Sequence, residues 1–123
     1  MIYNENLEKS DTKNQLRDDA IEFALLILNK TENIKGLSVY VNQLLRCSSS
    51  IGANIFEAKY AQSRLDFINK LEISLKESSE TEYWLTLLHK SGRLSESDYL
   101  QLKNTCGSIR RRLIASITTA KSK

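Results

Sequence analysis

The fold is decided by residues 46–85, which read RCSSSIGANIFEAKYAQSRLDFINKLEISLKESSETEYWL. Apolar residues recur along this stretch at the three- and four-residue spacing of amphipathic helices. A short polar break near Gln62 divides the stretch into two helices. Small and polar residues lie on or beside the packing faces, and no nucleophile motif, metal-ligand set or phosphate loop interrupts them. The stretch therefore predicts packed helices, and it favours binding over catalysis.

The rest of the chain continues the helical pattern. It has 123 residues, no proline and four glycines, and it lacks the alternating β-branched runs of strands. This length is typical of one domain, so residues 1–123 are expected to form a single unit. Helices are predicted over about 13–30, 37–60, 63–90 and 95–119. Their short connections predict an all-α, antiparallel up-down-up-down four-helix bundle.

Three of these helices show one apolar stripe each, which is the pattern of a helix that buries a single face. The stripe of the first helix consists of Leu16, Ala20, Phe23 and Ile27, that of the second of Val41, Leu44, Ser48, Ile51 and Ile55, and that of the fourth of Tyr99, Leu102, Cys106, Ile109, Leu113 and Ile117.

The helix over 63–90 has two apolar faces instead of one. Phe67, Leu71, Leu75, Ser78 and Leu85 form the first face. A bundle helix needs only one such face, so the opposite face is interpreted as a subunit interface. The alternative is a set of scattered apolar residues on the surface. The predicted interface residues are Ile73, Tyr83, Trp84 and Leu87.

The net charge of +3 is unevenly distributed along the chain. Residues 1–89 hold 10 Lys and Arg against 13 Asp and Glu, whereas residues 90–123 hold 8 against 2. Such a basic block is a candidate for phosphate contacts with a nucleic acid, either RNA or DNA. Tyr99 is the only nearby aromatic residue, which favours backbone contacts over base stacking. The predicted contact residues are Lys103, Arg110, Arg111, Arg112 and Lys121, and the alternative is a solvated helix face.

A band of polar residues crosses the second and third helices. A carboxylate at a packing face needs a partner, because an unpaired buried charge is costly. Arg46, Lys76 or Arg110 can supply one. We interpret the band as a buried hydrogen-bonded network, and the alternatives are a ligand pocket or a solvated face. Its members are Asn54, Glu57, Glu77, Glu80 and Glu82.

Catalytic and metal chemistry are not indicated. A di-iron bundle needs two Glu-x-x-His motifs, but His89 is the only histidine and Thr86 lies three residues before it. Cys47 and Cys106 fall inside predicted helices and are read as small hydrophobic residues in a reducing compartment. The sequence therefore predicts a protein that is not an enzyme and that has no metal or cofactor.

The targeting signals of secreted and membrane proteins are also missing. The first residues lack the charged-then-apolar layout of a signal peptide. The longest apolar run, Phe23–Leu28, is far shorter than the roughly 20 residues of a membrane span. We therefore expect a cytoplasmic protein without a membrane partner.

Three sequence elements resemble a known bacterial family. They are QLLR at 43–46, the block SSSIGANIFEA at 48–58, and LKE-xxET-x-YWL at 75–85. These elements resemble the four-helix-bundle family encoded in intervening sequences of 23S ribosomal RNA, also called the S23 ribosomal protein family. The similarity spans about residues 14–120 and is densest over 43–88.

This resemblance implies an antiparallel four-helix protomer in a ring-shaped homopentamer, with no catalytic residue. It also implies a relation to the accessory proteins of diversity-generating retroelements, which bind RNA and a reverse transcriptase through a basic surface. The chain reads ANIFEA where many relatives carry SNI-x-EG, so it resembles the intervening-sequence branch more closely. A ring would repeat the basic block and make it multivalent.

The expected function is therefore binding of structured RNA or another nucleic acid by a non-enzymatic homo-oligomer. Two other functions stay open at this point. One is a protein–protein adaptor that captures an unidentified protein and has no nucleic-acid role. The other is a bundle that binds a small molecule through the band around Asn54, Glu57 and Glu80.

Overall fold

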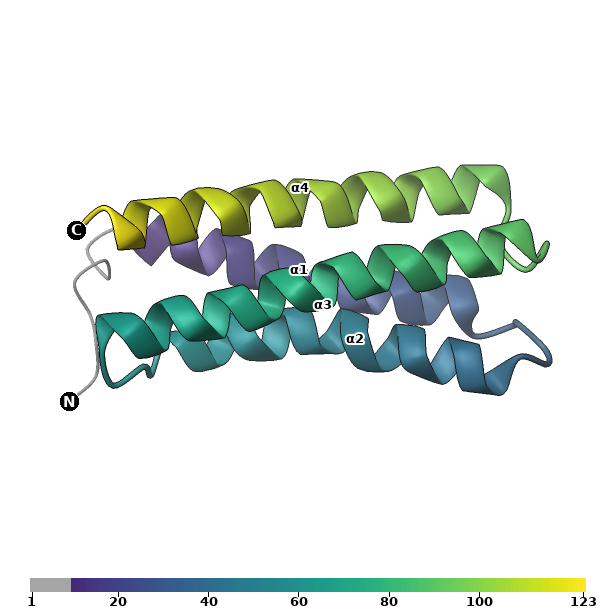
Figure 1. Cartoon of the computed structure of the whole chain (residues 1–123). Coiled ribbons are helices and arrows are strands. Elements are labelled where there is room, and N and C mark those ends of the chain that lie inside the picture. The colour runs from purple at the N-terminus through teal and green to yellow at the C-terminus, as the bar shows by residue number, and fades with distance from the viewer. Residues whose placement is uncertain (1–9) are drawn as a thin grey trace.

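The structure is a computed structural model that describes residues 10–123, with side chains from Gln15 onward. It contains α1 (Ser10–Thr31), α2 (Ser38–Ala58), α3 (Arg64–Lys90) and α4 (Glu96–Lys121), and the described residues form no strand. The α2–α3 turn lies at one end of the molecule with the end of α4, and the other two turns lie at the opposite end (Figure 1). The predicted all-α fold with four helices is confirmed, and the chain runs up-down-up-down.

The four helices form a square in cross-section. Each helix packs against its neighbours in the chain, and α1 and α4 close the square. The contact between α2 and α3 is the most extensive, and that between α1 and α4 is the least. α1 lies diagonally opposite α3, and α2 lies diagonally opposite α4. The outer faces of α1 and α3 therefore point away from each other.

The core is built from the apolar stripes that the helical spacing predicts. The stripes of α1 and α2 are buried except for Val41, and that of α4 is buried except for Tyr99. The α3 stripe differs, because Leu75 is only half-buried and Ile68 and Leu88 join the core. The largest fully buried apolar side chains are Phe23, Ile27, Leu44, Ile51, Leu85, Leu88, Leu102, Ile109 and Leu113.

Small residues allow α2 to approach its neighbours closely. A Cβ atom added to Gly52 would lie 3.4 Å from the Cβ of Ala20 on α1. On the other side, the buried Ser74 hydroxyl of α3 donates to the Ile51 carbonyl oxygen at 2.8 Å. The buried hydroxyl group between α2 and α3 is thus hydrogen-bonded, as most buried polar groups are.

Local sequence signals set the helix boundaries. The side chain of Ser63 accepts a hydrogen bond from the Asp66 amide at 3.0 Å and caps α3, and Ser95 does the same for α4 with the Asp98 amide at 3.0 Å. In the α1–α2 turn, Gly36 adopts a φ of 76°, a left-handed conformation that glycine tolerates. These signals explain why the predicted helix ranges agree closely with the observed ones.

None of the helices in the described part of the chain is both long enough and apolar enough to cross a membrane.

Candidate nucleic-acid interface

Three of the five predicted basic residues are held by carboxylates of other helices. Arg110 pairs with Glu82 of α3, and the Nζ of Lys121 lies 3.0 Å from an Oε atom of Glu72, also on α3. On the other edge of α4, an Nη atom of Arg112 lies 2.8 Å from an Oδ atom of Asp19 on α1. These pairs tie α4 to both of its neighbours, so their positive charge is largely compensated within the protomer.

Lys103 and Arg111 are the open positive charges of the block. Both are exposed, and neither contacts a carboxylate among residues 15–123. The Lys103 Nζ lies 5.7 Å from the centre of the Tyr99 ring. An Nη atom of Arg111 passes 3.3 Å from the point where a Cβ on Gly107 would lie. We call these two residues the open basic pair.

An aromatic stack that sequence reasoning missed lies beside Lys103. The rings of His89 and Tyr99 are parallel within 5° and their centres lie 4.2 Å apart. The His89 Nε2 lies 2.9 Å from an Oε atom of Glu96, and the Tyr99 hydroxyl lies 3.2 Å from that of Thr86. The α3–α4 turn brings these residues together. Because the Tyr99 ring already has these neighbours, it is not an open platform for a base.

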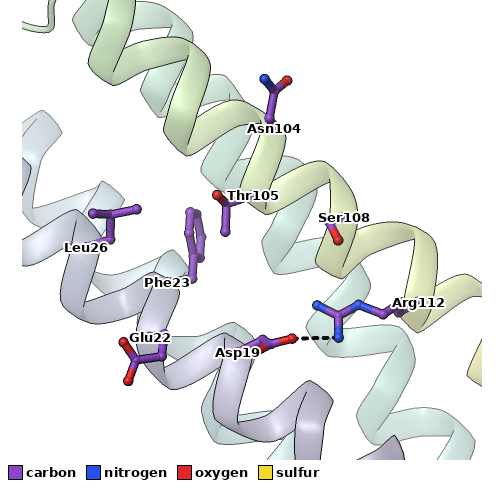
Figure 2. Close-up of a pocket in the computed structure, with 8 residues that line it drawn as sticks. All are labelled: Asp19, Glu22, Phe23, Leu26, Asn104, Thr105, Ser108 and Arg112. Carbon is purple, nitrogen blue, oxygen red and sulfur yellow. Dashed lines mark hydrogen bonds and ion pairs between the residues drawn. The ribbon is translucent and has the colours of Figure 1, made fainter.

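A shallow groove of about 480 Å³ lies between α1 and α4 (Figure 2). The ion pair of Asp19 and Arg112 spans it between the two helices, and the Arg112 Nε is buried without a hydrogen-bond partner among the described atoms. Two carboxylates and one guanidinium make the groove slightly acidic, so it does not extend the basic surface. It is lined by Asp19, Glu22, Phe23, Leu26, Asn104, Thr105, Ser108 and Arg112.

The predicted interface stripe on α3 is only partly exposed. Ile73 and Tyr83 are exposed, whereas Trp84 and Leu87 are half-buried. The Trp84 ring lies 5.7 Å from that of Tyr40 on α2, and its Nε1 donates to Glu80 at 3.3 Å. Part of the stripe therefore packs within the protomer, and its role between subunits stays a prediction.

The expectation of one buried polar network is corrected by the structure. Four of its five members are half-buried and Glu57 is exposed. They form separate groups: Arg46 bridges Glu77 and Glu80, Arg110 binds Glu82, Lys70 binds Glu57 at 2.9 Å, and the Asn54 amide donates to the Ser50 carbonyl.

The two cysteines sit in the core as free thiols. Burial raises the pKa of the Cys106 thiol to about 12 and also raises the pKa of Cys47. The Cys106 thiol donates to the Ser78 carbonyl oxygen at 3.4 Å. Both groups are therefore protonated and shielded, unlike a nucleophilic thiolate. Within residues 15–123, no cluster of His, Cys, Asp or Glu has the arrangement of a metal site.

Comparison with known proteins places this geometry in a family. The profile of the family described as "23S rRNA-intervening sequence protein" matches residues 12–115. A solved structure from Bacteroides thetaiotaomicron VPI-5482, described as a protein with unknown function from the S23 ribosomal protein family, is 43% identical. The alignment covers 86% of this chain and 97% of that one, with a TM-score of 0.81. No match was found among curated proteins. The relation to retroelement accessory proteins stays a prediction. The match of the family profile and the similarity to the solved structure show that the chain belongs to the 23S rRNA-intervening sequence protein family.

Proposed function

We propose that this protein binds structured RNA through phosphate contacts made by Lys103 and Arg111, and that it does so as a homo-oligomer, in the form of a ring. The observation that carries the proposal is the division of the basic block. Arg110, Arg112 and Lys121 have carboxylate partners inside the protomer, and the open basic pair has none among the described residues.

The physical reason is counterion release. A cation that already pairs with a carboxylate gains little from a phosphate, because the carboxylate would be left without its partner. An open Lys or Arg displaces condensed counterions from the nucleic acid when it binds. Two such contacts are weak in one protomer, and a ring repeats them and raises the avidity.

The proposed contacts are to the backbone and not to bases. The Tyr99 ring is already stacked on His89 at 4.2 Å and lies below the Lys103 ammonium. Lys103 and Arg111 can bind phosphates without any base entering this site. Recognition would then depend on how the folded RNA positions its phosphates, that is, on the shape of the RNA.

The proposed activity is non-enzymatic and belongs in the reducing cytoplasm. The raised pKa values of Cys47 and Cys106 support an inert role for both thiols. Free, buried cysteines are typical of proteins that never meet an oxidising compartment.

The test is a fluorescence-anisotropy titration against a structured RNA and a DNA duplex of the same length. We expect the double variant Lys103→Gln/Arg111→Gln to bind the RNA at least tenfold more weakly than the wild type. The matched control is Lys35→Gln/Arg64→Gln, which removes the same two residue types from exposed positions elsewhere. Equal weakening by the two variants would show a general charge effect and would refute the assignment to the open basic pair.

A further inference from the structure

The groove between α1 and α4 has two walls of opposite chemistry (Figure 2). The α1 wall carries the carboxylates of Asp19 and Glu22, and the α4 wall carries the hydroxyl of Ser108 and the guanidinium of Arg112. The volume of about 480 Å³ lies in the range of sites that bind small molecules. The groove therefore offers acceptors on one side and donors on the other, with room for a ligand between them.

The α4 wall has donors that the protein itself leaves open. Arg112 has five N–H donors, and the Nη atom that lies 2.8 Å from Asp19 is its only nitrogen with a partner among the described residues. Ser108 lies four residues before Arg112, on the same face of α4, and its hydroxyl makes no hydrogen bond within residues 15–123. A carboxylate is the acceptor that best matches a guanidinium. This wall therefore fits a carboxylate group.

Glu22 supplies the open negative charge of the facing wall. Both oxygens of Asp19 are occupied, one by Arg112 and the other by the Nε2 of Gln15 at 2.8 Å. Glu22 lies one turn further along α1, is exposed at the rim of the groove, and has no ion pair in the described part of the chain. Its carboxylate is therefore available to an ammonium group that enters the groove.

Apolar side chains continue the groove beyond the ion pair. The Phe23 ring stands between the two helices, with Leu26 on one side of it and Thr105 on the other (Figure 2). Leu26 is half-buried, so part of its surface still contacts water. A hydrocarbon group that covers this floor leaves water and gains the hydrophobic contribution to binding.

We propose that this groove binds a small zwitterion, namely a free α-amino acid with an apolar side chain. Its carboxylate accepts hydrogen bonds from Arg112 and Ser108, its ammonium group pairs with Glu22, and its side chain covers the apolar floor. A purely anionic ligand would face the two carboxylates of the α1 wall, and a purely cationic ligand would face the guanidinium. A ligand with both charges suits both walls. This site works independently of RNA binding by the open basic pair.

Binding in the groove has a consequence for stability. Among the four helix pairs in contact, α1 and α4 share the least extensive contact. A ligand held by Glu22 on α1 and by Arg112 on α4 joins these two helices. Because it binds only the folded chain, it raises the midpoint of thermal unfolding as its concentration rises.

The test is isothermal titration calorimetry of the full chain with five apolar L-amino acids: leucine, isoleucine, valine, methionine and phenylalanine. We expect saturable binding of at least one of them, with a Kd of about 1 mM or tighter. The amide of that amino acid, which lacks the carboxylate, and its analogue without the amino group should both bind at least tenfold more weakly. No saturable binding of any of the five, or equal binding of either analogue, would overturn the proposed site.

Matched variants locate the binding. Glu22→Gln should weaken binding of the amino acid at least tenfold, and Ser108→Ala at least fivefold. The controls are Glu32→Gln, which changes an exposed carboxylate just after α1, and Ser116→Ala, which changes a half-buried serine two turns further along α4. Both controls should leave binding unchanged, and circular dichroism verifies that all four variants are folded. Wild-type affinity in Glu22→Gln, or equal losses in the controls, would refute the assignment to this groove.

Discussion

At the scale of single residues, the most instructive feature is the run Arg110, Arg111 and Arg112. Successive residues of an α-helix point about 100° apart, because 3.6 residues complete a turn. Arg110 therefore reaches Glu82 on α3, Arg112 reaches Asp19 on α1, and Arg111 lies on the open surface between them. The sequence shows three adjacent positive charges, and the fold pairs two of them with carboxylates and leaves the third exposed.

This division predicts different outcomes for neighbouring arginines. Arg110→Gln leaves the half-buried Glu82 without its cation, and we expect a loss of about 1–3 kcal/mol in the free energy of unfolding. Arg111→Gln removes no contact with a carboxylate and should leave that free energy unchanged. Urea unfolding followed by circular dichroism measures both, and losses of equal size would contradict the assignment.

A second residue-scale prediction concerns pH. The hydrogen bond from the Trp84 indole and the adjacent Arg46 guanidinium lower the pKa of Glu80 from its ordinary value of 4.5. A lowered folded-state pKa means that the ionised form stabilises the fold above pH 4.5, and that this contribution is lost as pH falls through the folded-state pKa. Glu80→Gln should therefore be less stable than the wild type near neutral pH, with a smaller difference at about pH 3. Thermal unfolding at the two pH values measures this, and a difference that does not change with pH would refute it.

At the scale of helices, the thin middle of α2 determines how closely α1 packs. Gly52 faces Ala20, and an added Cβ would just touch the Ala20 Cβ at 3.4 Å. Serine and glycine are poor helix formers, so neighbouring helices hold this segment in place. The hydrogen bond from Ser74 to the Ile51 carbonyl is one such support.

We predict opposite effects for small and large substitutions at Gly52. Alanine fits at van der Waals contact and improves helix propensity, so Gly52→Ala should change stability by less than about 1 kcal/mol, in the stabilising direction. Gly52→Leu would push α1 away from α2 and should cost about 1–3 kcal/mol. Thermal unfolding of both variants measures this. Similar stability for the leucine variant would mean that α1 does not pack closely here.

Most of the helix-level structure is readable from the sequence, and the exceptions have a physical cause. Ser63 and Ser95 act as caps because capping depends on residues within one turn. The sequence pattern does not predict that Ser74 and Thr81 are buried. A hydroxyl side chain is expected at the surface unless a hydrogen-bond acceptor inside the protein is known. The Ser74 hydroxyl donates to the Ile51 carbonyl of α2, which lies beyond the reach of local spacing. The Thr81 hydroxyl lies 2.8 Å from the Glu77 carbonyl oxygen of its own helix and 3.2 Å from the Cys47 sulfur of α2.

At the scale of the whole molecule, the candidate site was predictable as a region and not as a set of residues. Charge asymmetry indicates that α4 is the basic helix, but charge counting cannot reveal which cations are compensated across helices. The same limit explains the polar band, whose carboxylates divide into separate ion pairs. Pairing between helices depends on the arrangement of the bundle, and a helical pattern alone does not specify it.

The open basic pair lies on α4. In the proposed ring, this pair would be repeated on every copy. Avidity from such repetition is how a small number of weak phosphate contacts gives useful affinity.

The measurement that tests the central claim most directly is the salt dependence of RNA binding by the wild-type protein. Each phosphate contact contributes roughly 0.7–0.9 to the slope of log affinity against log salt, so the open basic pair predicts a slope of about −1.5 or steeper. Anisotropy titrations of a structured RNA at several salt concentrations give this slope. No binding at low salt, or an affinity that does not change with salt, would contradict the nucleic-acid function.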